Sequence, residues 1–361
     1  MSKSRKWVFA WHAVGALVMW VAATVLVEGQ AAAPNADQSW TENTQSDSNN
    51  GSPSRTTESH IKSGNRTVDK KTVEVLGPDG RYQPYFVVET EQIQESPTLT
   101  RSITRTYNPG PNGGEELTQI TEAETHNSGD RARTVQTTSK ADYDGNLHVT
   151  EREITATTKG SDSQKTQTTI YVPSISGDLA PSMQVNEQQR NGAGGNMEVK
   201  KETLLRDAYG AWQVYEVREQ TVKGDAQNRT SDDRVSRRDF DGNVSPASEV
   251  ITTEKNVNGE LRSTSQTYSL DVPGSTRDQT LRPLQSSTTV RTKESGRTVT
   301  EQQIVQPDPG EPDLNFSVKT TDIIVTGNSG KEETIKVTAQ YPDGSPSVVL
   351  LETSTTDRLP Q

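Results

Sequence analysis

The five residues Asp142-Tyr143-Asp144-Gly145-Asn146 are a tight-turn signature that recurs as Asp239-Phe240-Asp241-Gly242-Asn243. Asp and Asn beside Gly tolerate the positive φ that hairpin turns require. The glycines of these turns belong to a series with steps of 33, 32, 32, 33, 32 and 32 residues, which Gly310 and Gly344 continue after longer steps: Gly80, Gly113, Gly145, Gly177, Gly210, Gly242 and Gly274. Such constant spacing indicates a structural repeat. We call these positions the glycine grid and their turns grid turns.

A second set of turn signatures, here called midway turns, lies halfway between the grid glycines, as in Asn127-Ser128-Gly129-Asp130 and Asn258-Gly259. The stretches between turns are rich in Thr, Val and Ile, as in Thr166-Gln167-Thr168-Thr169-Ile170-Tyr171-Val172, which favours strands. The sequence therefore predicts an all-β fold, with one hairpin per repeat of about 32 residues and about 18 long strands in a repetitive antiparallel meander. We expect an elongated or partly curled sheet.

Two closed folds, an outer-membrane barrel and a propeller, fit the sequence less well. An outer-membrane barrel matches the strand number and length, but each strand would need an apolar row facing lipid, and Thr134-Val135-Gln136-Thr137-Thr138-Ser139 offers only Val135. A propeller would need unusually long blades. Apolar residues cluster near the grid glycines, as in Tyr85-Phe86-Val87-Val88 and Val348-Val349-Leu350-Leu351, whereas the midway turns are polar. We therefore predict an apolar strip along one margin of the meander.

The composition excludes several classes of protein. The apolar fraction is 29%, aromatic residues make up 5%, and there are 4 Phe in 361 residues, so a large spherical core is not expected. The absence of Cys excludes disulfides, thiolate metal sites and cysteine nucleophiles. The net charge of -11 makes nucleic acid a poor partner, because phosphate binding needs a basic face.

Two segments precede the repeats. Lys3, Arg5 and Lys6 come before an apolar run from Trp7 to Val27, which predicts a signal peptide or uncleaved signal anchor over residues 1–31. Residues 32–65 are rich in Ser, Asn and Thr without a periodic apolar pattern, and they are predicted to be a disordered linker. The β-hairpin repeat domain is predicted over residues 66–357.

Candidate sites have simpler structural explanations. Asp142, Asp144, Asn146 and Glu153 have a spacing that resembles a calcium loop, but Gly145 is misplaced for one. The grid turns also resemble the YD-repeat motif of large secreted Rhs-type β proteins; that repeat is shorter, so we attribute the similarity to hairpin chemistry.

Carboxylates and arginines recur in Glu151-Arg152-Glu153 and Glu216-Val217-Arg218-Glu219, where we expect cross-strand ion pairs rather than a glycosidase pair. His60, His126 and His148 are expected to be surface residues. No catalytic, cofactor-binding or metal-binding residues are predicted, and no cofactor.

The function expected from these patterns is that of an exported, non-enzymatic β-repeat protein of the cell envelope or extracellular space, with a structural, adhesive or glycan-contacting role. The alternatives are a polysaccharide-acting enzyme with an acidic groove and a self-associating fibre or scaffold subunit. Envelope polysaccharide or other envelope proteins are the expected partners. A membrane contact is expected only through the N-terminal segment, if it is uncleaved. The location is expected to be periplasmic, cell-surface or extracellular.

Overall fold

The computed structural model describes residues 38–48, 51–110, 114–225, 227–239, 241–270, 280–307, 314–327, 330–340 and 346–360. The predicted signal segment 1–31 and the grid glycines Gly113, Gly274, Gly310 and Gly344 lie outside the described residues.

The described chain forms 20 strands and one short 3-10 helix, η1 (Ala193–Gly195). The first ten strands are β1 (Gln38–Ser48), β2 (Ser54–Ser63), β3 (Arg66–Leu76), β4 (Tyr82–Ser96), β5 (Leu99–Pro109), β6 (Glu115–Ser128), β7 (Arg131–Ala141), β8 (Leu147–Lys159), β9 (Ser163–Pro173) and β10 (Leu179–Asn191). The others are β11 (Met197–Arg206), β12 (Trp212–Gly224), β13 (Asn228–Arg238), β14 (Val244–Val257), β15 (Glu260–Ser269), β16 (Arg282–Glu294), β17 (Arg297–Pro307), β18 (Asn315–Thr326), β19 (Gly330–Gln340) and β20 (Pro346–Pro360).

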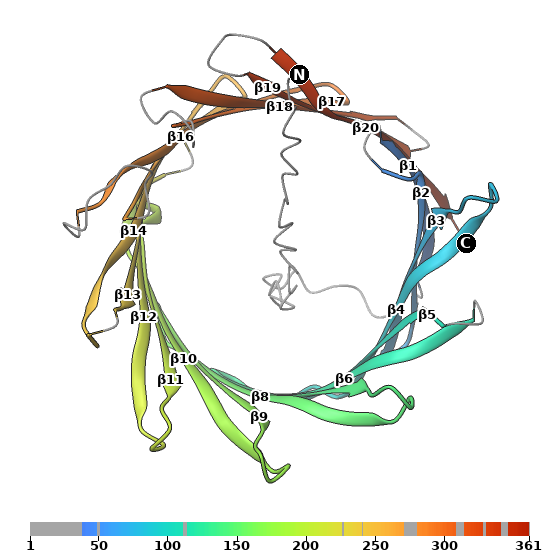
Figure 1. Cartoon of the computed structure of the whole chain (residues 1–361), viewed down its shortest axis with the longest axis vertical. Coiled ribbons are helices and arrows are strands. Elements are labelled where there is room, and N and C mark those ends of the chain that lie inside the picture. The colour runs from blue at the N-terminus through green and yellow to red at the C-terminus, as the bar shows by residue number, and fades with distance from the viewer. Residues whose placement is uncertain are drawn as a thin grey trace, which may run out of the picture. The chain divides into compact units, whose positions relative to one another are not determined.

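The sheet is a single layer that closes on itself. Each strand pairs antiparallel with the next along the chain, and the last strand, β20, pairs with β1. Nine register pairs form this seam, from Trp40 opposite Pro360 to Ser48 opposite Glu352. Figure 1 shows the resulting ring. The antiparallel meander is confirmed, but the expectation of an elongated or partly curled sheet is wrong, because the two terminal strands satisfy each other's backbone groups.

The predicted turns are where the sequence placed them. Gly80, Gly145, Gly177, Gly210 and Gly242 all have φ between 75° and 89°. Within the turn at Asp142, the carboxylate oxygen Oδ1 accepts hydrogen bonds from the backbone N–H groups of Asp144 and Asn146, each at 2.9 Å. The grid turn therefore combines a left-handed glycine with an aspartate that caps neighbouring N–H groups.

The structure has 20 strands rather than 18, because β1 and β2 fall within residues 32–65, the range expected to be a disordered linker. Their sequences are polar on both faces, so no alternation of apolar and polar residues indicates strands. β2 nevertheless pairs with β1 on one side and with β3 on the other. Backbone pairing with two neighbours supplies order that the side-chain pattern did not indicate.

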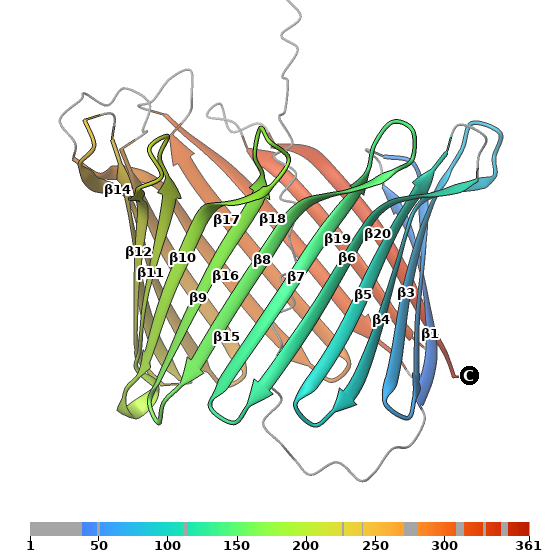
Figure 2. The ribbon, with the colours of Figure 1, turned by 90° about the horizontal axis from the view of Figure 1, so that it is seen from below.

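Antiparallel order puts the described grid turns at one end of the barrel and the described midway turns at the other; we call these ends the grid rim and the midway rim. The hairpins of one rim bend outward from the wall (Figure 2). Bulges recur next to the grid turns, and at three of them a hydroxyl donates to a carbonyl oxygen at 3.2 to 3.3 Å: Thr118 to Thr106, Thr150 to Thr138 and Ser182 to Ile170. Bulges increase strand twist and bend, which fits the flared rim.

Candidate functional site: the barrel lumen

The two faces of the wall can be told apart by exposure. In β8 and β9, Arg152, Ala156 and Gln167 share one face and are exposed, whereas Thr155 and Thr168 share the other and are half-buried. Side chains diverge on the convex outer face of a barrel and converge on the concave inner face. The more exposed set therefore points outward, and the half-buried set lines the lumen.

Threonines dominate part of the lumen wall. Directly opposed hydroxyls lie within hydrogen-bonding distance in several strand pairs, at 2.8 to 3.3 Å: Thr90 with Thr104, Thr121 with Thr138, Thr125 with Thr134, Thr155 with Thr168, and Thr157 with Thr166. Cross-strand pairs of this kind stabilise a sheet, and the β-branched side chain suits the pleat. The same hydroxyls make the lumen wall hydrophilic across β4 to β9.

The described side chains do not fill the lumen. Among the described residues, Val87, Val222 and Ala339 are the buried ones, at 1%, 1% and 3% exposure. A barrel packed with its own side chains would bury most of its inward-facing residues. Twenty strands about 4.8 Å apart, tilted by about 40°, give a backbone diameter of roughly 40 Å. Subtracting one side chain on each side leaves a passage roughly 30 Å wide.

Charged pairs are also present inside. His60 lies 2.6 Å from Asp69 and stacks on Trp40, with ring centroids 5.7 Å apart. Lys71 lies 2.7 Å from Glu58 on the same inner face. On the other side of the ring, Arg218 pairs with Asp233, and Arg237 pairs with Glu216 at 2.8 Å. Charges of both signs therefore line the passage, several of them as ion pairs.

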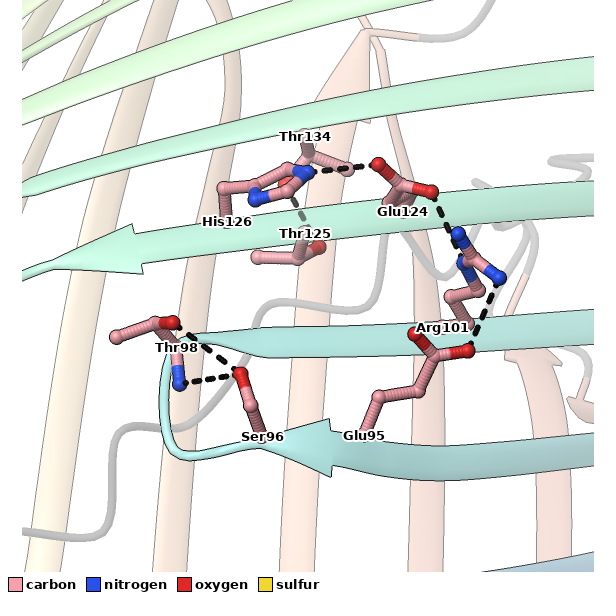
Figure 3. A network of polar contacts seen from close by, with 8 residues as sticks. All are labelled: Glu95, Ser96, Thr98, Arg101, Glu124, Thr125, His126 and Thr134. Atoms are coloured by element: carbon pink, nitrogen blue, oxygen red, sulfur yellow. Dashed lines mark hydrogen bonds and ion pairs between the residues drawn. The ribbon is translucent and has the colours of Figure 1, made fainter.

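The outward wall is more highly charged. Figure 3 shows Arg101 between two carboxylates: its Nη1 lies 3.0 Å from Glu95 Oε1, and its Nε lies 2.9 Å from Glu124 Oε2. Similar outward pairs join Arg234 to Glu249 at 2.8 Å and Lys319 to Glu301 at 2.7 Å. Exposed pairs of this kind contribute little stability.

The calcium-like turn is occupied by its own hydrogen bonds. Asp142 Oδ1 caps two backbone N–H groups, and its Oδ2 lies 2.8 Å from His148 Nε2. The Asn146 N–H and then the His148 ring lower the pKa of Asp142, and the matching Asp207 pKa is lowered by the Ala211 N–H and the Gln213 amide. Both turns use the carboxylate as a cap. Within the described residues, no group of three or more His, Asp or Glu side chains is placed to hold a metal ion.

The paired carboxylates do not converge on a cleft. Glu151 and Glu153 are one strand period apart and both face the lumen, while Arg152 faces outward. In the second group, a bulge at Tyr215 turns Glu216 and Arg218 inward, where they form the cross-strand ion pairs with β13 given above. Glu219 faces outward, 4.0 Å from Lys200.

Of the three histidines expected to be surface residues, His126 and His148 are exposed and His60 is half-buried. Each contacts a carboxylate: His60 with Asp69, His126 with Glu124 at 2.6 Å, and His148 with Asp142. Sequence reasoning missed these partners because two of the three contacts depend on register or on the turn. Only the separation of two residues between Glu124 and His126, which places them on one face of a strand, could have indicated a pair.

No helix among the described residues has the length and hydropathy of a membrane span. No protein-family model matches the chain, and no curated protein matches it.

Several solved structures resemble the chain at low sequence identity. The siderophore receptor PirA from Pseudomonas aeruginosa is 8% identical, with 91% of this chain and 81% of that chain covered and a TM-score of 0.49. The copper transporter OprC is 6% identical, with 91% and 81% covered and a TM-score of 0.47. Pseudomonas aeruginosa OccK3 (OpdO) is 7% identical, with 90% and 96% covered and a TM-score of 0.43. These identities concern the fold alone, and TM-scores below 0.5 carry no argument about function.

The expected adhesive or glycan-contacting repeat protein is overturned by the closed ring. That role and both alternatives assumed an open sheet with free edges or a groove between hairpins. In the described barrel every strand has two neighbours, so no edge strand remains for fibre assembly. The lack of an apolar, lipid-facing row in strands such as residues 134–139 does not argue against a barrel. Closure depends on backbone pairing between β1 and β20 and does not require apolar outer side chains.

Proposed function

We propose that the chain is a wide channel of the cell envelope, whose lumen lets polar solutes pass. The observation that supports it is the closed ring whose inner face is polar and left unfilled by the described side chains. Barrels of 16 to 18 strands already leave an aqueous channel, and this ring is wider. The leader-like N-terminal segment supports export to the envelope.

The outer wall determines how such a channel is placed. A wall that spans a bilayer carries an apolar band about 25 Å tall, and charges at its middle are costly. Here Arg105, Arg234 and Lys319 with their carboxylates occupy the outer wall between the rims. We therefore place the middle of the barrel in an aqueous or polar layer of the envelope, as a conduit, rather than in the hydrocarbon of a bilayer.

The test uses the absence of native Cys, which makes single-cysteine variants specific. Thr168→Cys puts a thiol in the lumen, and the neighbouring Gln167→Cys puts one on the outer wall as the matched control. Small thiol reagents should modify both at rates within roughly tenfold of each other, because both sites meet water. Maleimide polymers wider than the passage should modify the outer thiol alone.

Two results would overturn the proposal at the level of structure. An inner thiol that small reagents do not reach would mean a filled lumen, and one that the widest polymer reaches freely would mean an open wall. At the level of function, iodide added to the solution should quench a fluorophore on the inner thiol of Thr168→Cys about as strongly as one on Gln167→Cys. A polymer-bound quencher wider than the passage should quench the outer fluorophore alone. An inner fluorophore that iodide does not quench would refute the entry of polar solutes into the lumen.

A further inference from the structure

The exposed apolar side chains gather at one end of the barrel. Sixteen large apolar residues of the described chain are exposed, and three of them lie near the midway rim: Ile61, Val257 and Val325. The other thirteen lie at or next to grid turns and include Tyr85, Tyr143, Ile175, Tyr209, Val244 and Val348. The apolar margin predicted from the sequence is therefore present, and we call it the apolar rim.

The apolar rim runs around the ring rather than forming a patch on one side. Tyr85 belongs to β4, Ile175 to the turn between β9 and β10, and Tyr209 to the turn between β11 and β12. Val244 begins β14, and Val348 lies in β20. The described hairpin ends from β3 to β14 project outward from the ring (Figure 1). A folded protein partner would cover one arc of such a rim, whereas a lipid layer contacts its whole circumference at one level.

The turn tips are the most exposed part of this rim. Tyr143, Ile175 and Tyr209 are 106%, 110% and 98% exposed, so none of them packs against the barrel. Tyr at the boundary of a membrane places its ring among the headgroups and its hydroxyl in water. Apolar side chains held out at hairpin tips are thus positioned to enter a lipid interface without unfolding the wall.

The depth of insertion is limited by the outer charges. On β8, outward Leu147 and Val149 are each 39% exposed, and the next outward residue past the bulge is the exposed Arg152. Five residues of a tilted strand rise roughly 12 Å. Interfacial segments bury about 5 to 10 Å, whereas the hydrocarbon core is about 30 Å thick. The apolar rim fits the interface of one leaflet and does not reach across.

We propose that the apolar rim docks the barrel end-on onto a lipid layer by inserting its hairpin tips into one leaflet. The tips also carry carboxylates, including Asp142, Asp144 and Asp207. Zwitterionic lipid should therefore bind the rim better than anionic lipid, because like charges repel at the surface. This docking is independent of solute passage through the lumen.

The test is vesicle flotation of the protein as recovered from cells, after any processing of its N-terminal segment. One set of vesicles is made of phosphatidylcholine, and the other also contains phosphatidylglycerol. The rim variant is the triple substitution Tyr143→Ser, Ile175→Ser and Tyr209→Ser. The matched control is Ile61→Ser, Val257→Ser and Val325→Ser at the midway rim, which also replaces three exposed apolar residues. The rim variant should lose roughly tenfold or more in partitioning, while the control stays within about twofold of the unmodified chain.

Three outcomes would overturn the docking proposal: flotation of the rim variant equal to that of the unmodified chain, equal losses in both variants, or stronger binding to the anionic vesicles. Sedimentation without lipid tests the alternative that a second copy of the chain covers the rim. Self-association that the rim substitutions abolish would show this. Reactivity of Thr168→Cys in the rim variant reports the lumen separately. Loss of flotation with unchanged reactivity of the inner thiol bears on the docking proposal and leaves the channel proposal intact. An inner thiol that does not react, with unchanged flotation, bears on the channel proposal alone.

Discussion

A disulfide across the seam between β1 and β20 should form only if the barrel is closed. Thr44 and Thr356 are direct register partners, and their Oγ1 atoms lie 2.8 Å apart although the residues are 312 positions apart in sequence. Directly opposed residues of antiparallel strands have Cα atoms about 4.5 to 5.5 Å apart, within the range that a disulfide spans. In an elongated sheet the same two residues would lie at opposite margins.

The size of the effect follows from loop length. On the chain-entropy relation, closing a loop of 312 residues stabilises the fold by roughly 5.7 kcal/mol at 25 °C. The control is the pair Thr125 and Thr134, which are also direct partners on the inner face with Oγ1 atoms 2.9 Å apart, but are separated by 9 positions. The same relation gives roughly 2.6 kcal/mol for that loop. The seam disulfide should therefore stabilise the fold by about 3 kcal/mol more than the hairpin disulfide.

The assay compares T44C/T356C with T125C/T134C, each oxidised and reduced. Non-reducing gels report disulfide formation, and urea unfolding at constant m reports the free energy of unfolding. Both pairs replace inward threonines, so strain common to the two substitutions cancels in the comparison. Absence of an intramolecular seam disulfide, while the hairpin disulfide forms, would refute the closed barrel. A seam disulfide that forms but raises the free energy of unfolding no more than the hairpin disulfide would refute the dependence on loop length.

Two further predictions concern the turns. Gly145→Ala should destabilise the fold by about 1 to 2 kcal/mol because φ is 82° and a Cβ there meets no neighbouring atom, so backbone strain is the whole effect. Gly224→Ala should lower the free energy of unfolding further, because a Cβ would lie 2.0 Å from the Asn228 carbonyl oxygen. Gly51→Ala is the control: its Cβ meets no atom and its φ is not positive, so urea unfolding should not change. Asp142→Asn should lower Tm at neutral pH, because the lowered pKa of Asp142 means that its ionised form stabilises the fold above its ordinary pKa, and this contribution disappears as pH falls through the depressed value. Circular dichroism melts from neutral to acid pH should show the two proteins converging, and a gap that stays constant over that range would contradict the capping role.

The candidate site was much harder to anticipate than the fold class. Threonines such as Thr121 and Thr155 look alike in sequence, and nothing local says which face of the strand meets the lumen. Partners such as Arg218 with Asp233 arise from register between β12 and β13. His60 and Asp69 likewise meet because β2 pairs with β3. Residues 38–63 show the same limit, since their polar composition indicated a linker while pairing with neighbours made two strands.

The sequence by itself determined the turns, and through them the order and length of the strands. Gly145 needs no neighbour to favour a left-handed turn, and Asp142 caps it from three residues away, so this information is local. Closure was decided by the tertiary structure alone. It depends on tilt and twist accumulated over 20 strands until β20 returns to β1, more than 300 residues later. Because both faces of the wall are polar enough to meet water, the side-chain pattern does not record which way the sheet curves.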